Sequence, residues 1–562
     1  MKVGADSPPK GSTSNVTDRP VASLPSLLTN GNGWKLKDFV IVLSLVNLSY
    51  VRVWSELLTF EPADCFYLKR PFEASDYVAA MLGVLLIATV LWTLVVFAQR
   101  YVRGRLFRLC QFAFLAAAVL GPGLAVETVV RHASVAGRIF GAHHQTLTGW
   151  ASFFNFAEGL LQRKISRVIA AVAGCVVFVV VGRFLSRAVQ ITAVLLLCSA
   201  PFVVVTFSEA AYAAATHNFA PIPDQPPAPY LPTRSDVHVV WVVFDEWDYR
   251  LTFVDRDPSL RLDAIDRLRT EAMFAEDALP PAHNTPESMP SYVNGRRVQT
   301  SLPENAEELR ITYADTGETA IWGAQENLFS RVQAAGVNAG VLGWYLPYCR
   351  VFGSSLAQCS WVPRAIPANT TGSTLLQKLV GQPRSTLEST IFSPFGQSLS
   401  SRQHAKDYIL MDEEAQRLVT DKRLGLAFAH LPGPHAPFVY NKETGTLTRK
   451  NNLVHGYIDE LALTNRTITR LRKALEDSGE WDNTVLLLTA DHPFRNSESL
   501  DGKSDPRIPF LLKMKDQRNG MSISAPFNTV VIGDFVLAVL SGQVSTPEEA
   551  NGWFRQHAGS TQ

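Results

Sequence analysis

The sequence is poor in the features that mark several common classes of protein. Only six cysteines occur among 562 residues, and no pair has the CxxC spacing of a zinc finger. Basic and acidic residues nearly balance, at 52 against 51, so the formal net charge of +1 gives no sign of a nucleic-acid partner. No apolar stretch lies close to Met1, and we therefore expect no cleavable signal peptide.

Long apolar stretches follow a polar beginning. Residues 1–33 are rich in Ser, Pro, Gly and Asn and are predicted to form a disordered tail. Because a helix needs about 20 apolar residues to cross the hydrocarbon core of a bilayer, residues 34–212 are predicted to form an α-helical membrane domain of five transmembrane helices. The expected helices lie at about 38–54, 77–98, 107–130, 168–185 and 189–209.

Basic residues indicate how this domain is oriented. They cluster before the first expected helix, between the second and third, and between the fourth and fifth: Lys35, Lys37, Arg100, Arg103, Arg105, Arg183 and Arg187. Such clusters stay cytoplasmic, so the N-terminus is predicted inside and everything after about residue 210 on the periplasmic side of a bacterial-type inner membrane. Arg163, Lys164 and Arg167 would then lie outside, and we interpret residues 147–164 as an amphipathic interfacial stretch.

The second half of the chain has the pattern of an α/β domain. Residues 213–235 are predicted to be a Pro-rich linker, because their prolines prevent a continuous helix. From 236 to 545, short apolar runs alternate with amphipathic stretches, which predicts helices around a mostly parallel central sheet. Residues 546–562 are predicted to be a C-terminal tail.

Two expected strands end in candidate metal ligands. One apolar run, VVWVVF, ends before Asp245 and Glu246, and another, VLLLTA, ends before Asp491 and His492. Unbroken apolar runs are typical of parallel strands buried on both faces, and ligands gather at the carboxyl ends of such strands. Because an unpaired buried carboxylate is costly, the two pairs together predict a metal site. For either pair alone, an ordinary polar strand-to-loop junction is the alternative.

The segment HNTPESMPS between these strands offers a nucleophile. Thr285 and Ser288 are the candidates, since a nearby cation lowers the cost of forming an alkoxide. Alternatively, Thr285 caps a helix that begins near Pro286. A third apolar run ends in His430, and His435 follows a Pro/Gly turn, so either imidazole suits metal ligation or a hydrogen bond to an anionic substrate.

The cysteines fit the predicted topology. Cys349 and Cys359 lie ten residues apart in the expected outer domain, in a Gly/Ser-rich stretch. An oxidising compartment favours closing such a loop, so we predict a disulfide, with two free buried thiols as the alternative. Cys110, Cys175 and Cys198 lie inside expected membrane helices and are interpreted as small apolar residues.

Taken together, these segments resemble the sulfatase-like branch of the alkaline phosphatase superfamily, and within it the membrane-bound phosphoethanolamine and phosphoglycerol transferases. The motifs that carry the resemblance occur in order between about 236 and 540: FDE, TPESMP, HLPGPHAPF, DNTVLLLTADH and RIPFLLK. The resemblance implies that Thr285, Asp491, His492 and either Asp245 or Glu246 hold one divalent ion. A mixed carboxylate, hydroxyl and imidazole set favours zinc or manganese.

The resemblance also implies a two-step transfer of a phospho-linked headgroup. Thr285 would attack the phosphorus of a phospholipid donor, and a surface glycan, lipid or polyol would then accept the group. His435 is expected to contact the headgroup, His430 is a second candidate for proton donation, and Ser288 is a candidate substrate-binding residue. The sequence gives no indication of the oligomeric state.

The chain departs from the family pattern in three places. Pro493 stands where the family usually has Gly after its Asp-His pair, and a later histidine found in many phosphoethanolamine transferases has no counterpart before Arg507. These departures keep open a non-catalytic relative that acts in envelope assembly. TPESMPS lacks the Cys and Arg of the C/S-x-P-S-R arrangement of sulfatases, which disfavours sulfate-ester hydrolysis. A phosphate- or sulfate-ester hydrolase is the alternative enzyme.

Overall fold

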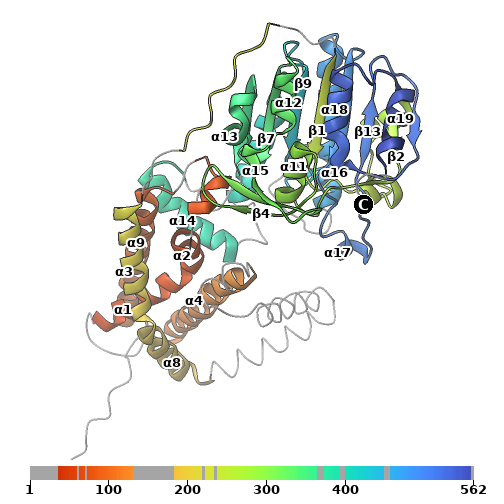
Figure 1. Cartoon of the computed structure of the whole chain (residues 1–562). Coiled ribbons are helices and arrows are strands. Elements are labelled where there is room, and N and C mark those ends of the chain that lie inside the picture. The colour runs from red at the N-terminus through yellow and green to blue at the C-terminus, as the bar shows by residue number, and fades with distance from the viewer. Residues whose placement is uncertain are drawn as a thin grey trace, which may run out of the picture. The chain divides into compact units, whose positions relative to one another are not determined.

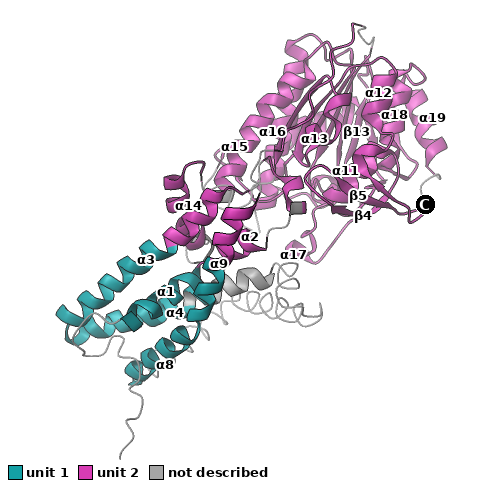
Figure 2. Cartoon of the chain, turned by 60° about the vertical axis from the view of Figure 1, so that its left-hand side comes forward, with its two compact units in different colours: residues 1–49, 84–131, 143–207 teal, residues 50–83, 132–142, 208–562 magenta. Residues whose placement is uncertain are grey.

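The computed structural model describes residues 36–59, 62–69, 72–131, 183–217, 222–232, 237–363, 372–390, 399–447 and 456–558. The chain divides into two compact units (Figure 2). Unit 1 takes residues from 1–49, 84–131 and 143–207, and unit 2 takes residues from 50–83, 132–142 and 208–562. Unit 2 therefore combines the α/β domain with a segment that lies early in the sequence.

The N-terminal half is helical. Its described helices are α1 (Leu36–Ser49), α2 (Val51–Leu58), α3 (Ala74–Tyr101), α4 (Gly104–Arg131), α8 (Leu185–Cys198) and α9 (Ala200–Thr216). Within unit 1, α1, α4 and α8 pack through a small apolar cluster that includes Ile41, Phe114 and Val189. Among the described residues, two helical segments are long and apolar enough to cross a membrane, Ala74–Tyr101 and Leu185–Thr216. The fourth expected helix, at 168–185, lies almost entirely outside the described residues.

The first expected helix, at 38–54, is wrong as a single element. The chain ends α1 at Ser49 and begins α2 at Val51. In α2 an ion pair between Arg52 and Glu56 lies on one side, while Trp54 is buried, so this helix is amphipathic and not apolar all round. A span drawn through both helices would carry charged residues into the hydrocarbon core.

The α/β domain is built on an eight-stranded sheet with the order β14-β2-β13-β12-β1-β9-β7-β8 (Figure 1). Its strands are β1 (His238–Phe244), β2 (Met273–Ala275), β7 (Ala339–Tyr345), β8 (Gln358–Pro363), β9 (Leu426–Leu431), β12 (Thr484–Ala490), β13 (Phe510–Lys513) and β14 (Met521–Ile523). Only β13 runs antiparallel to its neighbours, so the prediction of a mostly parallel sheet is confirmed.

The sheet is covered on both faces, which explains its unbroken apolar strands. Alternate residues of β1 enter two different apolar clusters: Val239, Trp241 and Val243 lie in one, and Val240 and Val242 in the other. The first cluster is completed by α11 (Thr285–Asn294), α12 (Leu328–Ala334), α18 (Ile532–Leu540) and α19 (Pro547–His557). The second is completed by α10 (Asp263–Glu271), α15 (Leu399–Val419) and α16 (Gly456–Asp477).

Shorter strands and helices complete the α/β domain. They are β3 (Ala278–Leu279), β4 (Val298–Pro303), β5 (Leu309–Tyr313), β6 (Thr319–Ile321), β10 (Tyr440–Asn441), β11 (Thr446–Leu447), β15 (Phe527–Asn528), α13 (Tyr348–Phe352), α14 (Leu375–Thr390) and α17 (Glu498–Asp501). The 3₁₀ helix η1 (Pro62–Tyr67) belongs to unit 2 although it lies between α2 and α3 in the chain.

The sequence-based boundaries of the α/β domain need three corrections. Phe66 of η1 is fully buried in the core of the domain, so the domain is not confined to 236–545. The expected tail at 546–562 begins with α19, whose Phe554 is buried in the same core. The expected linker at 213–235 starts after α9 ends at Thr216 and then lies along the domain, where Ala228 donates a backbone hydrogen bond to Leu356. The predicted tail at 1–33 lies outside the described residues.

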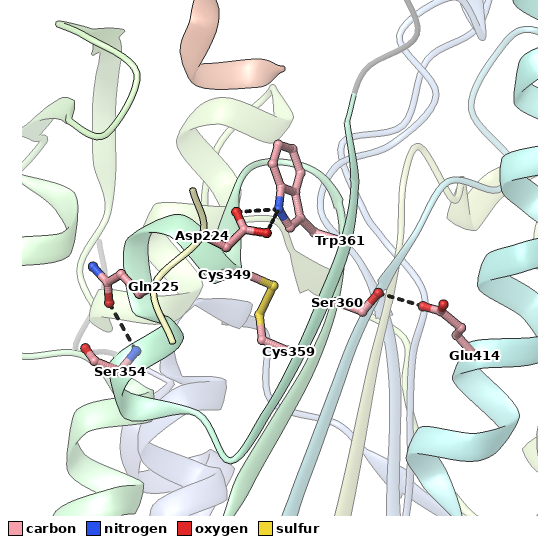
Figure 3. Close-up of a disulfide and its surroundings, with 8 residues drawn as sticks. All are labelled: Asp224, Gln225, Cys349, Ser354, Cys359, Ser360, Trp361 and Glu414. Carbon is pink, nitrogen blue, oxygen red and sulfur yellow. Dashed lines mark hydrogen bonds between the residues drawn. A yellow bond between two sulfur atoms is a disulfide. The ribbon is translucent and has the colours of Figure 1, made fainter. Parts of the chain in front are cut away.

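The structure joins Cys349 and Cys359 in a disulfide, as the sequence predicts, with Cα atoms 5.5 Å apart (Figure 3). The bond ties α13 to β8 at the edge of the sheet. Two neighbouring contacts hold the linker at the same edge: Asp224 accepts a hydrogen bond from the indole of Trp361 at 3.0 Å, and Gln225 accepts one from the backbone of Ser354 at 3.1 Å.

Candidate active site

The site forms where the central parallel strands end. Phe244, the last residue of β1, pairs in register with Ala490, the last residue of β12, so Asp245 and Asp491 follow side by side. His430 of β9 pairs with Val243 on the other side of β1. The carboxyl ends of parallel strands lie at the same end of the sheet. Three separate stretches of sequence therefore place ionisable side chains close together at that end.

Thr285 lies at the centre of this group. It is the first residue of α11, which Pro286 starts with a fixed φ at an N-terminal position. The Thr285 hydroxyl donates to Asp491 Oδ2 at 2.7 Å and lies 3.4 Å from Asp245 Oδ1. It also lies 3.3 Å from His492 Nε2. Asn284 occupies the N-cap position and makes no side-chain capping bond, so Thr285 faces the carboxylates and does not serve as the cap.

The residues present fit a divalent cation. Asp245, His430 and Asp491 each offer a ligand atom, and these atoms lie within 4.8 Å of one another in the buried group. The Nδ1 of His430 lies 3.2 Å from the Tyr348 hydroxyl, whereas its buried Nε2 has no hydrogen-bond partner among the described residues. Burial lowers the pKa of His430 to about 4, so the imidazole is neutral and free to donate a lone pair.

The pKa shifts of the two aspartates also favour a bound cation. Burial, together with the Asp491 and Glu246 carboxylates, raises the pKa of Asp245 well above its usual range. For Asp491, burial opposes ionisation, but His492, His430 and the hydrogen bond from Thr285 lower its pKa overall. One carboxylate of the pair is thus charged and the other resists ionisation. A bound cation would allow both to ionise and would give the unpartnered Nε2 of His430 a ligand bond.

The side chain of Glu246, the competing candidate ligand, points toward Arg495 and not toward Thr285. It adopts a left-handed backbone conformation with φ of 66°, and its carboxylate pairs with Arg495 Nε at 2.6 Å. Its amide donates to Asp491 Oδ1 at 3.1 Å. Arg495 also donates to His435 Nε2 at 3.1 Å. Of the two acidic neighbours, it is therefore Asp245 that faces Thr285, while Glu246 orients Arg495.

A cavity of about 430 Å³ opens onto this group. It is lined by Asp245, Asn284, Thr285, Pro286, Glu287, Trp344, Tyr345, His404, His435, Ala436, Pro437 and Arg495. The cavity therefore brings the candidate nucleophile and His435 to the same space. His430 is fully buried and is not part of the lining, which places it behind the site.

Ser288 is not brought to the cavity. It lies one helical turn after Thr285 in α11, is fully buried, and is absent from the lining. Within the described part of the chain its hydroxyl has no hydrogen-bond partner. The prediction that Ser288 binds substrate finds no support in this arrangement, because a turn of helix points its side chain into the core.

Several residues of the site escape prediction from the sequence. Trp344 donates its indole N–H to Asp245 Oδ2 at 3.1 Å, and Tyr345 beside it adopts a positive φ of 68°. Glu287 accepts a bond from Ser301 through Oε1 at 3.0 Å, while its buried Oε2 has no partner among the described residues. Two of them had a visible signal, since Glu287 lies in the TPESMP motif and Arg495 follows Asp491 by four residues. The aromatic pair ends a strand without any charged residue to mark it.

The family assignment rests on the sequence of this domain. A family model described as Sulfatase matches residues 238–541, more than half of the chain. The chain belongs to the sulfatase family. The predicted membership of the alkaline phosphatase superfamily is thereby confirmed, and the chain is a sulfatase-family enzyme, a hydrolase or transferase of that superfamily. No curated protein matches the chain.

Three solved structures that resemble this sulfatase-family chain share little sequence identity with it. Phosphonate monoester hydrolase of Agrobacterium radiobacter is 11% identical over 54% of this chain and 74% of its own, with a TM-score of 0.37. The lipoteichoic acid synthase LtaP from Listeria monocytogenes is 12% identical over 55% and 73%, with a TM-score of 0.34. Ps i-CgsB, solved in complex with k-i-k-neocarrahexaose, is 14% identical over 56% and 74%, with a TM-score of 0.38.

Proposed function

We propose that this enzyme is a membrane-anchored, metal-dependent phosphotransferase that moves a phospho-linked headgroup from a phospholipid to a surface glycan, lipid or polyol. The observation that carries the proposal is the Thr285 hydroxyl, which lies at the head of a helix, 2.7 Å from Asp491 Oδ2, and lines the cavity. A threonine in this position is a nucleophile for phosphorus, whereas sulfatase chemistry uses a modified Cys or Ser.

The proposed reaction has two balanced steps. In the first, Thr285 Oγ1 forms a bond to the donor phosphorus, its proton passes to Asp491 Oδ2, and the bond to the diacylglycerol oxygen breaks. In the second, an acceptor hydroxyl attacks the same phosphorus and Thr285 recovers its proton. His435 lines the cavity and, when its Nε2 carries a proton in place of the bond from Arg495, is the candidate to protonate the diacylglycerol oxygen and then to deprotonate the acceptor.

Asp245, Thr285, His430, Asp491 and His492 are the residues that would hold one divalent ion, zinc or manganese by their donor types. When bound, such an ion supplies electrostatic stabilisation of the negative charge that develops on the phosphoryl oxygens. Arg495, which is held by Glu246 at 2.6 Å, adds a positive charge to the cavity wall from the protein itself. An anionic diester thus finds one positive side chain in a lining that also contains the carboxylates of Asp245 and Glu287.

The lipid donor explains the helical half of the chain. The two apolar segments Ala74–Tyr101 and Leu185–Thr216 are long enough to anchor the protein in a bilayer. Together with the basic loops, they support a multi-pass topology in which the α/β domain lies on the outer, periplasmic side. Reporter fusions at residue 30 and residue 240 are expected to show opposite sides of the membrane. If both fusions report the same side of the membrane, the predicted five crossings are wrong.

The mass of the intermediate tests the function most directly. Incubation of the full-length enzyme with phospholipid in nanodiscs, followed by acid quenching and mass spectrometry, is expected to reveal a phospho-linked adduct on the peptide that contains Thr285. The mass of the adduct identifies the headgroup. A peptide without an adduct, while the donor lipid is consumed, would favour direct hydrolysis over a covalent transfer.

Replacement of His435 by alanine is expected to lower kcat/KM by roughly 10²- to 10⁴-fold, the usual contribution of a general acid or base. Metal content measured by mass spectrometry should not change, because His435 is not part of the buried ligand group. His283→Ala is the matched control, since His283 is exposed and absent from the cavity lining. Equal losses in both variants would refute the assignment of His435 to the substrate.

A further inference from the structure

α14 (Leu375–Thr390) presents apolar side chains to the outside of unit 2. Leu376 is 72% exposed, Val380 62% and Leu387 47%. Their spacing of four and seven residues places them on one side of the helix. In a soluble domain such a stripe turns inward and removes its apolar surface from water. Here it does the opposite.

The buried side of α14 is polar. Lys378 and Gln382 are each only 1% exposed, and Ser385 is 8% exposed. These residues also repeat at four- and three-residue spacing, so they form the opposite stripe of the same helix. The helix is therefore amphipathic in the reverse sense, with polar residues inside and apolar residues outside. This is the pattern expected of a helix whose outer surroundings are less polar than water.

The polar stripe is fixed to the first turn of an apolar helix. Lys378 Nζ pairs with Glu73 at 2.8 Å and with Asp76 at 2.9 Å, and Gln382 donates to the backbone carbonyl of Asp76 at 2.9 Å. Asp76 lies in the first turn of α3, one of the two segments long and apolar enough to cross a membrane. α14 also packs on α2 within unit 2 (Figure 2).

From this arrangement we propose that α14 docks on the surface of the lipid bilayer, with Leu376, Val380 and Leu387 inserted among the lipids. The bilayer is the occupant because α14 is bound to the point where α3 begins its apolar run. The 16-residue helix is too short to cross a membrane and contains Lys378 and Arg384, so it lies in the interface plane. The inference rests on the proposed membrane location of the enzyme and adds a second, peripheral contact.

This contact has a consequence for catalysis. In the chain α14 precedes α15, which carries His404 into the lining of the active-site cavity. α14 and the cavity belong to the same unit, so a docked α14 holds the cavity at a fixed distance from the lipid surface. Docking is therefore expected to favour phospholipid donors over soluble ones.

Spin labels at single cysteines test the docking without reference to activity. Leu376→Cys, Val380→Cys and the control Lys473→Cys are introduced into full-length protein in which Cys65, Cys110, Cys175 and Cys198 are replaced, and the labelled proteins are placed in phosphatidylethanolamine/phosphatidylglycerol nanodiscs. Labels at 376 and 380 are expected to be more accessible to lipid-soluble oxygen than to a water-soluble nickel complex, and the label at the exposed Lys473 position to be the reverse. Greater nickel access at 376 and 380, or spin–spin broadening between copies, would overturn the proposal.

A kinetic comparison separates docking from the chemistry. In a Leu376→Asp/Val380→Asp variant, transfer from phospholipid in nanodiscs is expected to fall at least roughly ten-fold, because charges disfavour insertion, while cleavage of soluble bis(p-nitrophenyl) phosphate stays within about two-fold. Equal losses on both substrates would refute a docking role. If the unmodified enzyme acts on neither substrate, the proposed function fails, whereas the spin-label result still decides the docking.

Discussion

Replacement of Thr285 by alanine is expected to lower the rate of headgroup transfer by roughly four to six orders of magnitude, the loss seen when a catalytic nucleophile is removed. The hydroxyl supplies the atom that bonds to phosphorus, and no other serine or threonine belongs to the described lining of the cavity. The fold should persist, because Asp491 still accepts hydrogen bonds from the amides of His492 at 2.8 Å and Glu246 at 3.1 Å. Loss of one buried hydrogen bond costs about 1–3 kcal/mol.

Two further variants separate nucleophile from scaffold. Thr285→Ser is expected to retain measurable transfer, because the hydroxyl survives with a less restricted rotamer. Ser288→Ala is expected to retain nearly full transfer, since its hydroxyl lies in the core, one turn away from the cavity. Transfer is measured with labelled phospholipid in nanodiscs, and thermal unfolding is measured in parallel. Full activity in Thr285→Ala, or loss only in Ser288→Ala, would contradict the covalent mechanism.

The parts of the site that the sequence predicts are those that depend on strand ends. Apolar runs reveal β1 and β12, and in a parallel sheet the residue after each strand must lie at one edge, so the meeting of Asp245 with Asp491 follows from local patterns. The choice between Asp245 and Glu246 does not follow, because it depends on the positive φ at Glu246 and on its ion pair with Arg495. Both are tertiary features.

Contacts between distant segments account for what the sequence does not predict. From the sequence, η1 is expected to be part of a short loop between the first two predicted membrane helices. In the structure, Phe66 lies in the core of a domain that starts about 170 residues later in the chain. The stripe of α14 looks like an ordinary core-facing stripe, and its outward direction depends on the partners of Lys378. Hydrophobic periodicity predicts that a helix has an apolar stripe, but it does not identify the surface that the stripe contacts. The predicted disulfide needed only local spacing, and the structure contains it.

The second large effect expected is on stability. Phe66→Ala should lower the free energy of unfolding of the α/β domain by about 3–5 kcal/mol, the usual cost of truncating a buried phenylalanine. The 0% exposure of Phe66 and its place in the core cluster give the reason. For a domain of this size the loss corresponds to a fall in Tm of roughly 6–15 °C, measured by tryptophan fluorescence in detergent. Phe97→Ala, at a position that is 55% exposed on α3, is the matched control.

The same variant is expected to loosen the wall of the cavity, because Phe66 is held together with its neighbours. Buried Arg350 donates hydrogen bonds to the carbonyls of Phe66 at 3.3 Å and Leu68 at 2.7 Å, and the ring of Tyr67 lies 4.9 Å from that of Tyr345, which lines the cavity. A raised KM below the new Tm is therefore expected in Phe66→Ala and in Tyr67→Ala. If Phe66→Ala unfolds at the same temperature as Phe97→Ala, η1 does not contribute to the core of the domain. An unchanged KM in Tyr67→Ala would show that the ring contact between Tyr67 and Tyr345 does not shape the cavity.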